Sequence, residues 1–222
     1  MNAADPHAGW RRRACWLALL CWAGFAIMFG LIETGHVQSF DAAGLTMWRN
    51  GAELARPLGP GWLSEAVRDY TALGSALLRN IFALGALVAL FFLERRREAV
   101  LFFATVCGGW ALSDTIKLLV QRPRPMIVPH LVHAGGSSFP SAHSFNAAVV
   151  YITMALAFSA LSQRRAVRLT LIASAVVLTV LVALSRVWLG VHNPSDVIAG
   201  WLGGAGWALL ASAILTERDA IR

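Results

Sequence analysis

Six long apolar stretches dominate this sequence and limit the folds it can adopt. A transmembrane helix takes roughly 20 apolar residues, and six stretches approach or reach that length: 14–32, 74–93, 99–119, 142–161, 167–188 and 195–215. Charged residues make up only 14% of the chain, against about 25% in soluble domains. Because lipid offers no hydrogen bonds, a spanning segment satisfies its own backbone as a helix. The sequence therefore predicts an all-α protein, a six-transmembrane-helix bundle.

The six stretches define one membrane domain over residues 14–215, with short tails at 1–13 and 216–222. The first stretch follows three arginines, as in a signal peptide. Its apolar run is longer than the usual ~7–15 residues, however, and no small-x-small cleavage site follows it. We therefore interpret it as a retained membrane helix.

Residues 34–73, between the first two stretches, have a mixed composition. Tryptophan and leucine alternate there with arginine and glutamate, and glycine and proline interrupt the pattern. This mixture predicts short amphipathic helices that lie in the membrane interface between spans one and two. An ordinary polar loop is the alternative.

Clusters of arginine predict the orientation of the bundle. They lie at 11–13, at 95–97, at 164, 165 and 168, and at 218 and 222. With six spans all four clusters fall on the same side, and short basic loops mark the cytoplasmic side of a membrane. We therefore expect an integral protein of the bacterial plasma (inner) membrane with both tails in the cytoplasm.

The formal net charge of +7 does not indicate a nucleic-acid partner. The basic residues form short clusters between apolar runs and no continuous stripe. The three cysteines, Cys15, Cys21 and Cys107, lie inside apolar runs without the spacing of metal ligands. We expect them to be packing residues, neither a disulfide framework nor a zinc site.

Three short polar blocks interrupt the second half of the chain. They are residues 117–125 (KLLVQRPRP), 140–143 (PSAH) and 185–196 (SRVWLGVHNPSD). In the six-span arrangement all three emerge on the non-cytoplasmic face, where charges avoid the cost of at least ~2.5–3.5 kcal/mol at the bilayer centre. The sequence therefore predicts one site, on the periplasmic or extracellular face, to which all three blocks contribute.

The blocks supply three cations, Lys117, Arg124 and Arg186. Lysine is a point charge, while arginine offers a planar fork that matches the oxygens of a phosphate. Three cations in one place repel one another unless an anion joins them, so the set predicts a phosphate site. Taken singly, each residue also fits a side chain that snorkels to lipid headgroups.

The second block predicts the start of a helix. Pro140 suits the first turn, and the unpaired backbone N–H groups of a helix start bind phosphate. The hydroxyl of Ser141 adds one donor, and His143 then lies beside the bound anion. A capped helix start with an interfacial histidine is the simpler alternative.

The third block places a histidine and a carboxylate at the start of the last span. Asn193 can cap this helix and Pro194 can take its first position, which makes Asp196 the third residue. Asp196 can accept the imidazole N–H of His192, which fixes the tautomer and frees the other nitrogen to attack. In the alternative, Asp196 is a capping acid stabilised by the helix dipole, and the two roles are compatible.

The two histidines need opposite protonation states. An attacking His192 must be neutral, while a His143 that protonates a leaving oxygen must start protonated. Fixed cations around the equatorial oxygens already support phosphoryl transfer, so we expect no metal and no other cofactor. Metal binding by His130 and His133, which lie in the loop before the second block, is an alternative.

The blocks resemble the signature of the type 2 phosphatidic acid phosphatase (PAP2) superfamily, also called the lipid phosphate phosphatases. That signature reads Lys-x6-Arg-Pro, Pro-Ser-Gly-His and Ser-Arg-x5-His-x3-Asp, and residues 117–125 and 185–196 fit its first and third elements. In the second element Ala142 replaces the glycine. Alanine keeps the N–H, but its Cβ would cost about 1–2 kcal/mol if the position needed a positive φ. The resemblance covers the chain from about Tyr70 onward.

The resemblance implies a six-helix membrane bundle and a role for each matching residue. His192 is the implied nucleophile and forms a phosphohistidine, His143 is the acid for the leaving group, and Asp196 orients His192. The residues implied to hold the phosphate are Lys117, Arg124, Ser141, the backbone of Ala142, and Arg186.

Together these features predict an enzyme, a metal-independent phosphatase acting on a membrane lipid phosphate or diphosphate. The resemblance implies undecaprenyl diphosphate, phosphatidic acid, phosphatidylglycerol phosphate or a lipid A phosphate as substrate. Two alternatives remain. One is a phosphotransferase that uses the same phosphohistidine, and the other is a non-enzymatic transporter or lipid-binding protein, which would not need the pairing of His192 with Asp196.

Overall fold

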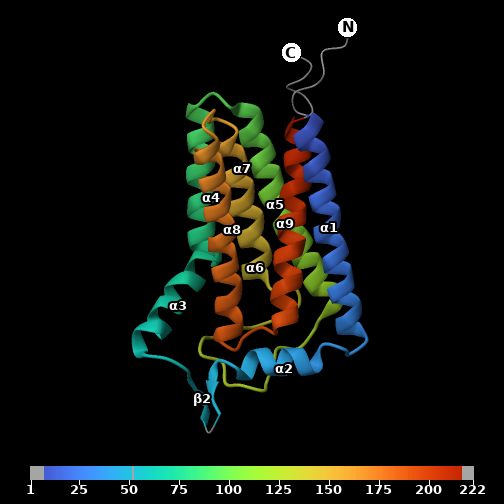
Figure 1. Cartoon of the computed structure of the whole chain (residues 1–222), viewed down its shortest axis with the longest axis vertical. Helices are drawn as coiled ribbons and strands as arrows, with labels where there is room; N and C mark the ends of the chain where they lie inside the picture. Colours follow the sequence, from blue (N-terminus) through green and yellow to red (C-terminus); the bar gives the residue numbers. More distant parts are fainter. Residues whose placement is uncertain (1–7, 52, 217–222) are drawn as a thin grey trace.

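The computed structural model describes residues 8–51 and 53–216, most of them in helices that run side by side (Figure 1). The long elements are α1 (Ala8–Glu33), α4 (Ala76–Phe92), α5 (Arg96–Val120), α8 (Arg165–Trp188) and α9 (Pro194–Thr216). One further helix is compound, with a π-helical turn, η1 (Ala148–Ile152), between α6 (Ala142–Ala147) and α7 (Thr153–Ser159). The structure thus confirms a mainly helical bundle.

The number of membrane spans depends on one bent helix pair. In the described part of the chain, five helices or compound helices are long and apolar enough to cross a membrane. A sixth span requires α3 (Gly61–Leu73) and α4 to act together, although they bend by 51° at a short break. The hydroxyl of Ser75 caps α4 at this break by accepting the N–H of Leu78 at 3.5 Å. The predicted six spans are therefore five, or six if the bent pair is one span.

Residues 34–73 form more regular structure than a polar loop. They contain α2 (Gln38–Thr46), a small antiparallel hairpin of β1 (Arg49–Asn50) and β2 (Glu53–Pro57), and then α3. Figure 1 shows α2 lying across the lower end of the bundle and α3 leaving it obliquely. The two helices match the expectation of short helices, whereas the hairpin was not predicted. Their place in the membrane interface stays a prediction.

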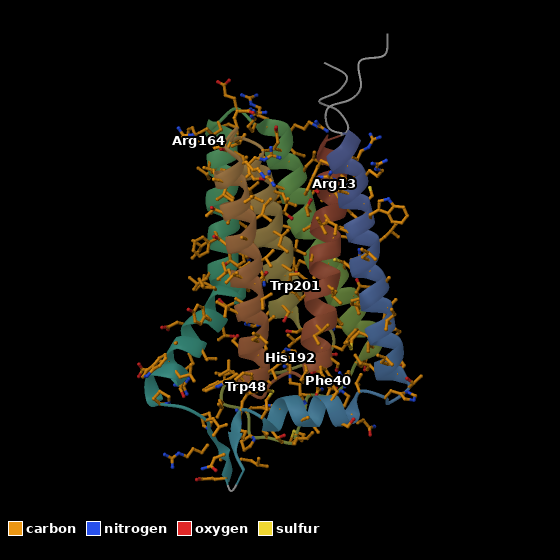
Figure 2. The ribbon with its side chains drawn as sticks, in the orientation of Figure 1. Arg13, Phe40, Trp48, Arg164, His192 and Trp201 are labelled. Atoms are coloured by element: carbon orange, nitrogen blue, oxygen red, sulfur yellow. The ribbon has the colours of Figure 1, made fainter. Side chains whose placement is uncertain are left out.

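The first helix begins before the predicted membrane span. Helix α1 begins at Ala8, so the arginines at 11–13 are helical. Arg13 and Arg164 lie at the same end of the bundle (Figure 2), as the orientation argument requires. The basic residues at 218 and 222 lie outside the described residues.

Helix α9 packs closely against α6 and η1 through small residues. Ala205 and Ala208 are buried against Ala148 and Ile152, and a Cβ added at Gly204 would overlap the backbone carbonyl of Phe145. Small residues allow such close approach of helices in a membrane. The first turn of α9 consequently lies beside the start of α6.

Candidate active site

The three polar blocks gather at one end of the bundle. Figure 2 shows His192 at this end, near Trp48 and close above α2, with Arg13 and Arg164 at the opposite end. The second and third blocks are joined directly, because the backbone N–H of Ser141 donates to the carbonyl of Asp196 at 3.1 Å. The segments 117–125, 140–143 and 185–196 thus contribute to a common site.

His192 lies in the short connection between α8 and α9 and is 2% exposed. Its Nε2 is 3.1 Å from Nη1 of Arg124, and its Nδ1 is 3.3 Å from the hydroxyl of Ser138. A guanidinium has donors only, so Nε2 must be the acceptor. The proton of the neutral ring is therefore on Nδ1, and Nε2 carries the free lone pair.

A serine hydroxyl stands between His192 and Asp196. Ser138 donates to Oδ2 of Asp196 at 2.6 Å and can accept the Nδ1–H of His192. The direct Nδ1–Oδ2 distance is 3.8 Å, which is too long for a hydrogen bond. The contact predicted from the spacing of His192 and Asp196 is thus made through Ser138, which the sequence argument did not include.

Asp196 also caps helix α9, as the alternative interpretation proposed. Its Oδ2 accepts the backbone N–H of Asn193 at 2.9 Å and the side-chain amide of Asn193 at 3.3 Å. The helix begins at Pro194, as predicted. Because the Asn193 amide donates to Asp196, this first turn holds the carboxylate beside Ser138. The contacts that cap the helix and the contact to Ser138 are thus made by one carboxylate.

The surroundings of His192 favour its neutral form. Burial lowers the pKa of His192 from 6.5 to about 4, and the charges of Arg124 and Arg186 act in the same direction. Asp196 opposes this shift but does not overcome it. His192 is consequently unprotonated at neutral pH, as an attacking imidazole must be.

The three predicted cations point into the same region from three elements. Arg124 is close enough to both Lys117 and Arg186 for their charges to interact. Lys117 donates to the carbonyl of Ser137 at 2.7 Å, and Arg186, only 5% exposed, donates to the hydroxyl of Thr71 on α3 at 2.7 Å. The Nε of Arg186 is buried without a partner, so this guanidinium keeps an unused donor.

Arg124 is braced by backbone carbonyls. Its guanidinium donates to Val191 at 2.7 Å and to Gly135 at 2.7 Å, while Nε lies 3.2 Å from the carbonyl of Gly136. Burial lowers the pKa of Arg124 from its usual value, against the opposing charge of Asp196. These contacts fix the cation beside Nε2 of His192.

The second block forms a helix start, although the helix begins at Ala142, two residues after Pro140. Ser141 is the N-cap and accepts the N–H of Ser144 at 3.4 Å, so Pro140 lies outside the helix and not in its first turn. The non-glycine residues with positive φ in the described chain are Glu94 and Gln121. Ala142 is not among them, so its Cβ causes no backbone strain where the family signature has glycine.

His143 is the second residue of α6 and is partly exposed. It is close enough to His192, Arg124 and Arg186 for their charges to act on it. A Cβ added at Gly74 would come within 3.1 Å of the His143 ring, which places this ring against the break between α3 and α4. The structure therefore brings the two histidines to the same end of the bundle, with cations near both.

Sequence reasoning missed two further members of this cluster. Arg122, which lies inside the first block, pairs with Asp196 and with Asp41 of α2. The position of Arg122, two residues before Arg124, was a signal that it belongs to the site. No sequence pattern connected Asp41 to it, because α2 lies far from the blocks along the chain.

The alternative of a metal site at His130 and His133 gains no support from the geometry. Nε2 of His130 lies 2.8 Å from the carbonyl of Pro125. Among the described residues, no group of three or more His, Cys, Asp or Glu side chains is arranged to hold a metal ion.

A helical membrane bundle that holds a buried neutral histidine among fixed cations defines a membrane enzyme that handles phosphate. The sequence profile of the PAP2 superfamily matches residues 98–220. A phosphatidylglycerophosphatase B of Bacillus subtilis is 35% identical over 185 residues, which cover 80% of this chain and 84% of the relative. A lipid A 1-phosphatase of Rhizobium etli is 34% identical over 125 residues, which cover 52% of this chain and 49% of the relative.

The fold leads to the same family. A crystal structure of a transmembrane PAP2 type phosphatidylglycerolphosphate phosphatase from Bacillus subtilis superposes with a TM-score of 0.82 and 28% identity. The match covers 93% of this chain and 100% of that one. The chain belongs to the PAP2 superfamily and is a phosphatase of this type.

Proposed function

We propose that this protein hydrolyses a membrane lipid phosphate or diphosphate through a phosphohistidine at His192, without a metal ion. The observation that carries the proposal is the pair of contacts made by the His192 ring. Its Nδ1 lies 3.3 Å from Ser138 and its Nε2 lies 3.1 Å from Arg124. A neutral imidazole whose lone pair faces a phosphate-binding cation is suited to attack phosphorus.

In the first step, the lone pair of Nε2 forms a bond to phosphorus as the bond from phosphorus to the leaving oxygen breaks. The negative charge of the bound substrate favours protonated His143 against the nearby cations, and His143 gives its proton to that oxygen. Water then attacks phosphorus, His143 takes a proton from the water, and the bond to Nε2 breaks. Inorganic phosphate leaves and both histidines return to their starting states, with Asp196 orienting His192 throughout through Ser138.

The cations stabilise the charge on the three equatorial oxygens. Arg124 and Arg186 offer guanidinium donors, and Lys117 offers an ammonium donor that now contacts a backbone carbonyl. Ser141 and the backbone N–H of Ala142 stand at the start of α6, where unpaired N–H groups favour an anion. An incoming phosphate would replace the contact between Arg124 and Nε2 of His192.

The substrate we propose to test first is phosphatidylglycerol phosphate. A relative whose match covers 80% of this chain is named a phosphatidylglycerophosphatase. Undecaprenyl diphosphate, phosphatidic acid and a lipid A phosphate complete the panel. We further propose that the site faces the periplasm or cell exterior, with both termini in the cytoplasm of the inner membrane. A lipid substrate then presents its headgroup to the site and keeps its chains in the bilayer.

The test measures phosphate release from each lipid by purified protein in detergent, with EDTA present. We expect activity on at least one lipid, and a loss of roughly 10³-fold or more in His192→Ala. Brief incubation with labelled lipid should leave an acid-labile phosphate on the wild-type protein but not on His192→Ala. Undiminished turnover by His192→Ala would rule out the mechanism.

The same assay separates hydrolysis from transfer. Reactions run with an added alcohol or sugar acceptor are analysed for both inorganic phosphate and phosphorylated acceptor. Hydrolysis predicts that inorganic phosphate accounts for the substrate consumed. If the main product is a phosphorylated acceptor, the protein is a phosphotransferase. The proposed phosphohistidine would then still be formed, but the overall reaction would be transfer and not hydrolysis.

A further inference from the structure

Helix α2 carries a buried carboxylate into the active site, although α2 lies outside the bundle of long helices (Figure 1). Asp41 is only 3% exposed. Its Oδ1 accepts the backbone N–H of Ser195 at 2.9 Å, and its Oδ2 accepts the hydroxyl of Ser195 at 2.7 Å. Asp41 therefore holds the first turn of α9, next to Asp196.

The same carboxylate pairs with Arg122. One guanidinium nitrogen, Nη2, donates to Asp41 at 2.8 Å, while Nη1 donates to Asp196 and to the hydroxyl of Ser195. Burial opposes the charge of Arg122, but Asp196 and Asp41 outweigh it and raise the pKa of Arg122. A single permanent cation thus stands between two buried carboxylates.

A second contact presses α2 against α9. A Cβ added at Gly44 would overlap the ring of Pro194, the first residue of α9. Gly44 and Asp41 are three residues apart and so share one face of α2. That face is the one that meets α9, and the close approach at Gly44 lets the short side chain of Asp41 reach Ser195 and Arg122.

We propose that Asp41 is a positioning residue for the reaction. It fixes Arg122 and the start of α9, and these two fix the carboxylate of Asp196. Asp196 in turn holds Ser138 at 2.6 Å, and Ser138 holds the Nδ1 side of His192. The inference rests on the proposed function, because it assumes that His192 attacks the phosphate.

The arrangement explains why a helix outside the bundle would matter to the chemistry. Without Asp41, Arg122 keeps a single carboxylate partner and Ser195 loses two hydrogen bonds. Asp196 and the His192 ring are then free to move, and a displacement of about 1 Å can cost about 10²-fold in rate. Lys117, Arg124 and Arg186 do not touch Asp41, so substrate binding should change little.

The first test compares Asp41→Asn with Asp69→Asn, a matched change of an exposed acid on α3. Steady-state kinetics on the best lipid substrate should show a fall of about 10–100-fold in kcat for Asp41→Asn. KM should change little, and Asp69→Asn should match wild type. An unchanged kcat in Asp41→Asn would overturn the proposal, and so would an effect confined to KM.

A double-mutant cycle separates positioning through Arg122 from a general structural role. In an Arg122→Gln background the route through Arg122 is already broken, so adding Asp41→Asn should cause a smaller loss of kcat than it causes in the wild type. Losses that multiply would overturn the route through Arg122. If Asp41→Asn does not fold alone, the kcat of the double variant relative to Arg122→Gln still tests the route, because a large further loss would show that Asp41 acts without Arg122.

A third variant disturbs the docking of α2 and leaves both carboxylates in place. Gly44→Ala must push α2 away from Pro194, whereas a Cβ at Gly61, on α3, meets nothing within 4 Å. We expect Gly44→Ala to lower kcat with little change in KM, and Gly61→Ala to match wild type. Wild-type kcat in Gly44→Ala would contradict the role of α2.

Failure of this inference can be told apart from failure of the proposed function. If the wild-type protein releases no phosphate from any lipid, the proposed function fails. If the wild-type protein is active and the variants of Asp41 and Gly44 match it, only the role of Asp41 fails.

Discussion

Arg124 lies beside the nitrogen that we propose as the nucleophile, 3.1 Å from Nε2 of His192. Its charge makes the ring less basic, which weakens a nucleophile, but it also keeps the lone pair free of a proton. In the proposed mechanism the same cation then stabilises the charge on the oxygens of the bound phosphate. On the other side of the ring, Ser138 and Asp196 restore part of the basicity. The reactivity of His192 is set by this balance.

Protonation of His192 should appear in the stability of the protein. The pKa of His192 is about 4 in the folded state, against an ordinary 6.5, so the unfolded chain binds a proton between these values that the folded chain does not. Stability therefore falls as pH drops from 6.5 toward 4, at about 1.4 kcal/mol per pH unit. Thermal unfolding in detergent at pH 6.5 and pH 5 should show a larger drop for wild type than for His192→Asn. Equal drops would contradict the low pKa.

The bridging hydroxyl of Ser138 gives a second prediction. Ser138→Ala removes the donor to Asp196 and the acceptor for Nδ1 of His192, and breaking a hydrogen bond to a charged group costs about 1.5–3 kcal/mol. We expect kcat to fall by about 10–100-fold, measured as phosphate release from the lipid substrate. Ser64→Ala, on α3, serves as the control. Full activity in Ser138→Ala would mean that Asp196 orients His192 without the serine.

At the scale of elements, the site depends on how closely helices approach one another. Helix α9 brings Asp196 to the site, α6 brings Ser141 and His143, and the two meet where the N–H of Ser141 donates to the carbonyl of Asp196. The approach of these helices is set farther along, where Gly204 lies against the backbone of Phe145. A backbone carbonyl cannot move aside without moving its helix, so a change in this contact would shift α6 relative to α9 and displace the site residues that the two helices carry.

We therefore expect Gly204→Ala to be destabilising. The added Cβ overlaps the Phe145 carbonyl, and overpacking of this kind costs about 1–3 kcal/mol. Gly30→Ala on α1 meets nothing within 4 Å and should raise stability by about 0.5–1 kcal/mol, because alanine is the better helix former. Melting temperatures in detergent should move in opposite directions. A neutral Gly204→Ala would show that the two helices can separate at little cost.

At the scale of the whole molecule, the bundle is apolar on the outside as well as inside. Large hydrophobic side chains along its long helices are strongly exposed, among them Leu77 at 71%, Phe92 at 79% and Leu119 at 79%. A surface of this kind in water would aggregate or bind a partner. Facing lipid, the same side chains are in their preferred solvent. The polar site lies at one end of the bundle, and Arg13 and Arg164 lie at the other (Figure 2).

Orientation in the membrane can be measured with single cysteines in a variant that lacks Cys15, Cys21 and Cys107. Met126, which is 87% exposed in the segment that carries Arg124, marks the site end, and Arg164 marks the opposite end (Figure 2). With the site outside and the basic clusters inside, an impermeant maleimide added to intact spheroplasts should label Met126→Cys but not Arg164→Cys. Both should be labelled after lysis. The reverse pattern in intact spheroplasts would place the site in the cytoplasm.

Much of the fold and of the site was predictable from local patterns. Hydropathy is a property of a single segment, so the sequence predicted each of the long helices. The exception concerns α4, which the sequence predicted as a span by itself and which reaches the length of a span only together with α3. The motifs identified Lys117, Arg124, His143, His192 and Asp196 by spacing, and the structure places all of them at one end. Pro140 was predicted to lie in the first turn of the helix, but it precedes the helix, because Ser141 is the N-cap.

A membrane bundle with phosphate chemistry could be inferred from the amino-acid sequence alone, because apolar length and motif spacing are properties of short stretches that no partner element can change. The way the site residues are held in place depends on tertiary packing. Ser138 stands between His192 and Asp196 because the loop before α6 turns toward α9, and Asp41 reaches Arg122 because α2 lies against Pro194. Such contacts join segments far apart in the chain. They follow from the way helices and loops pack together, which no local pattern encodes.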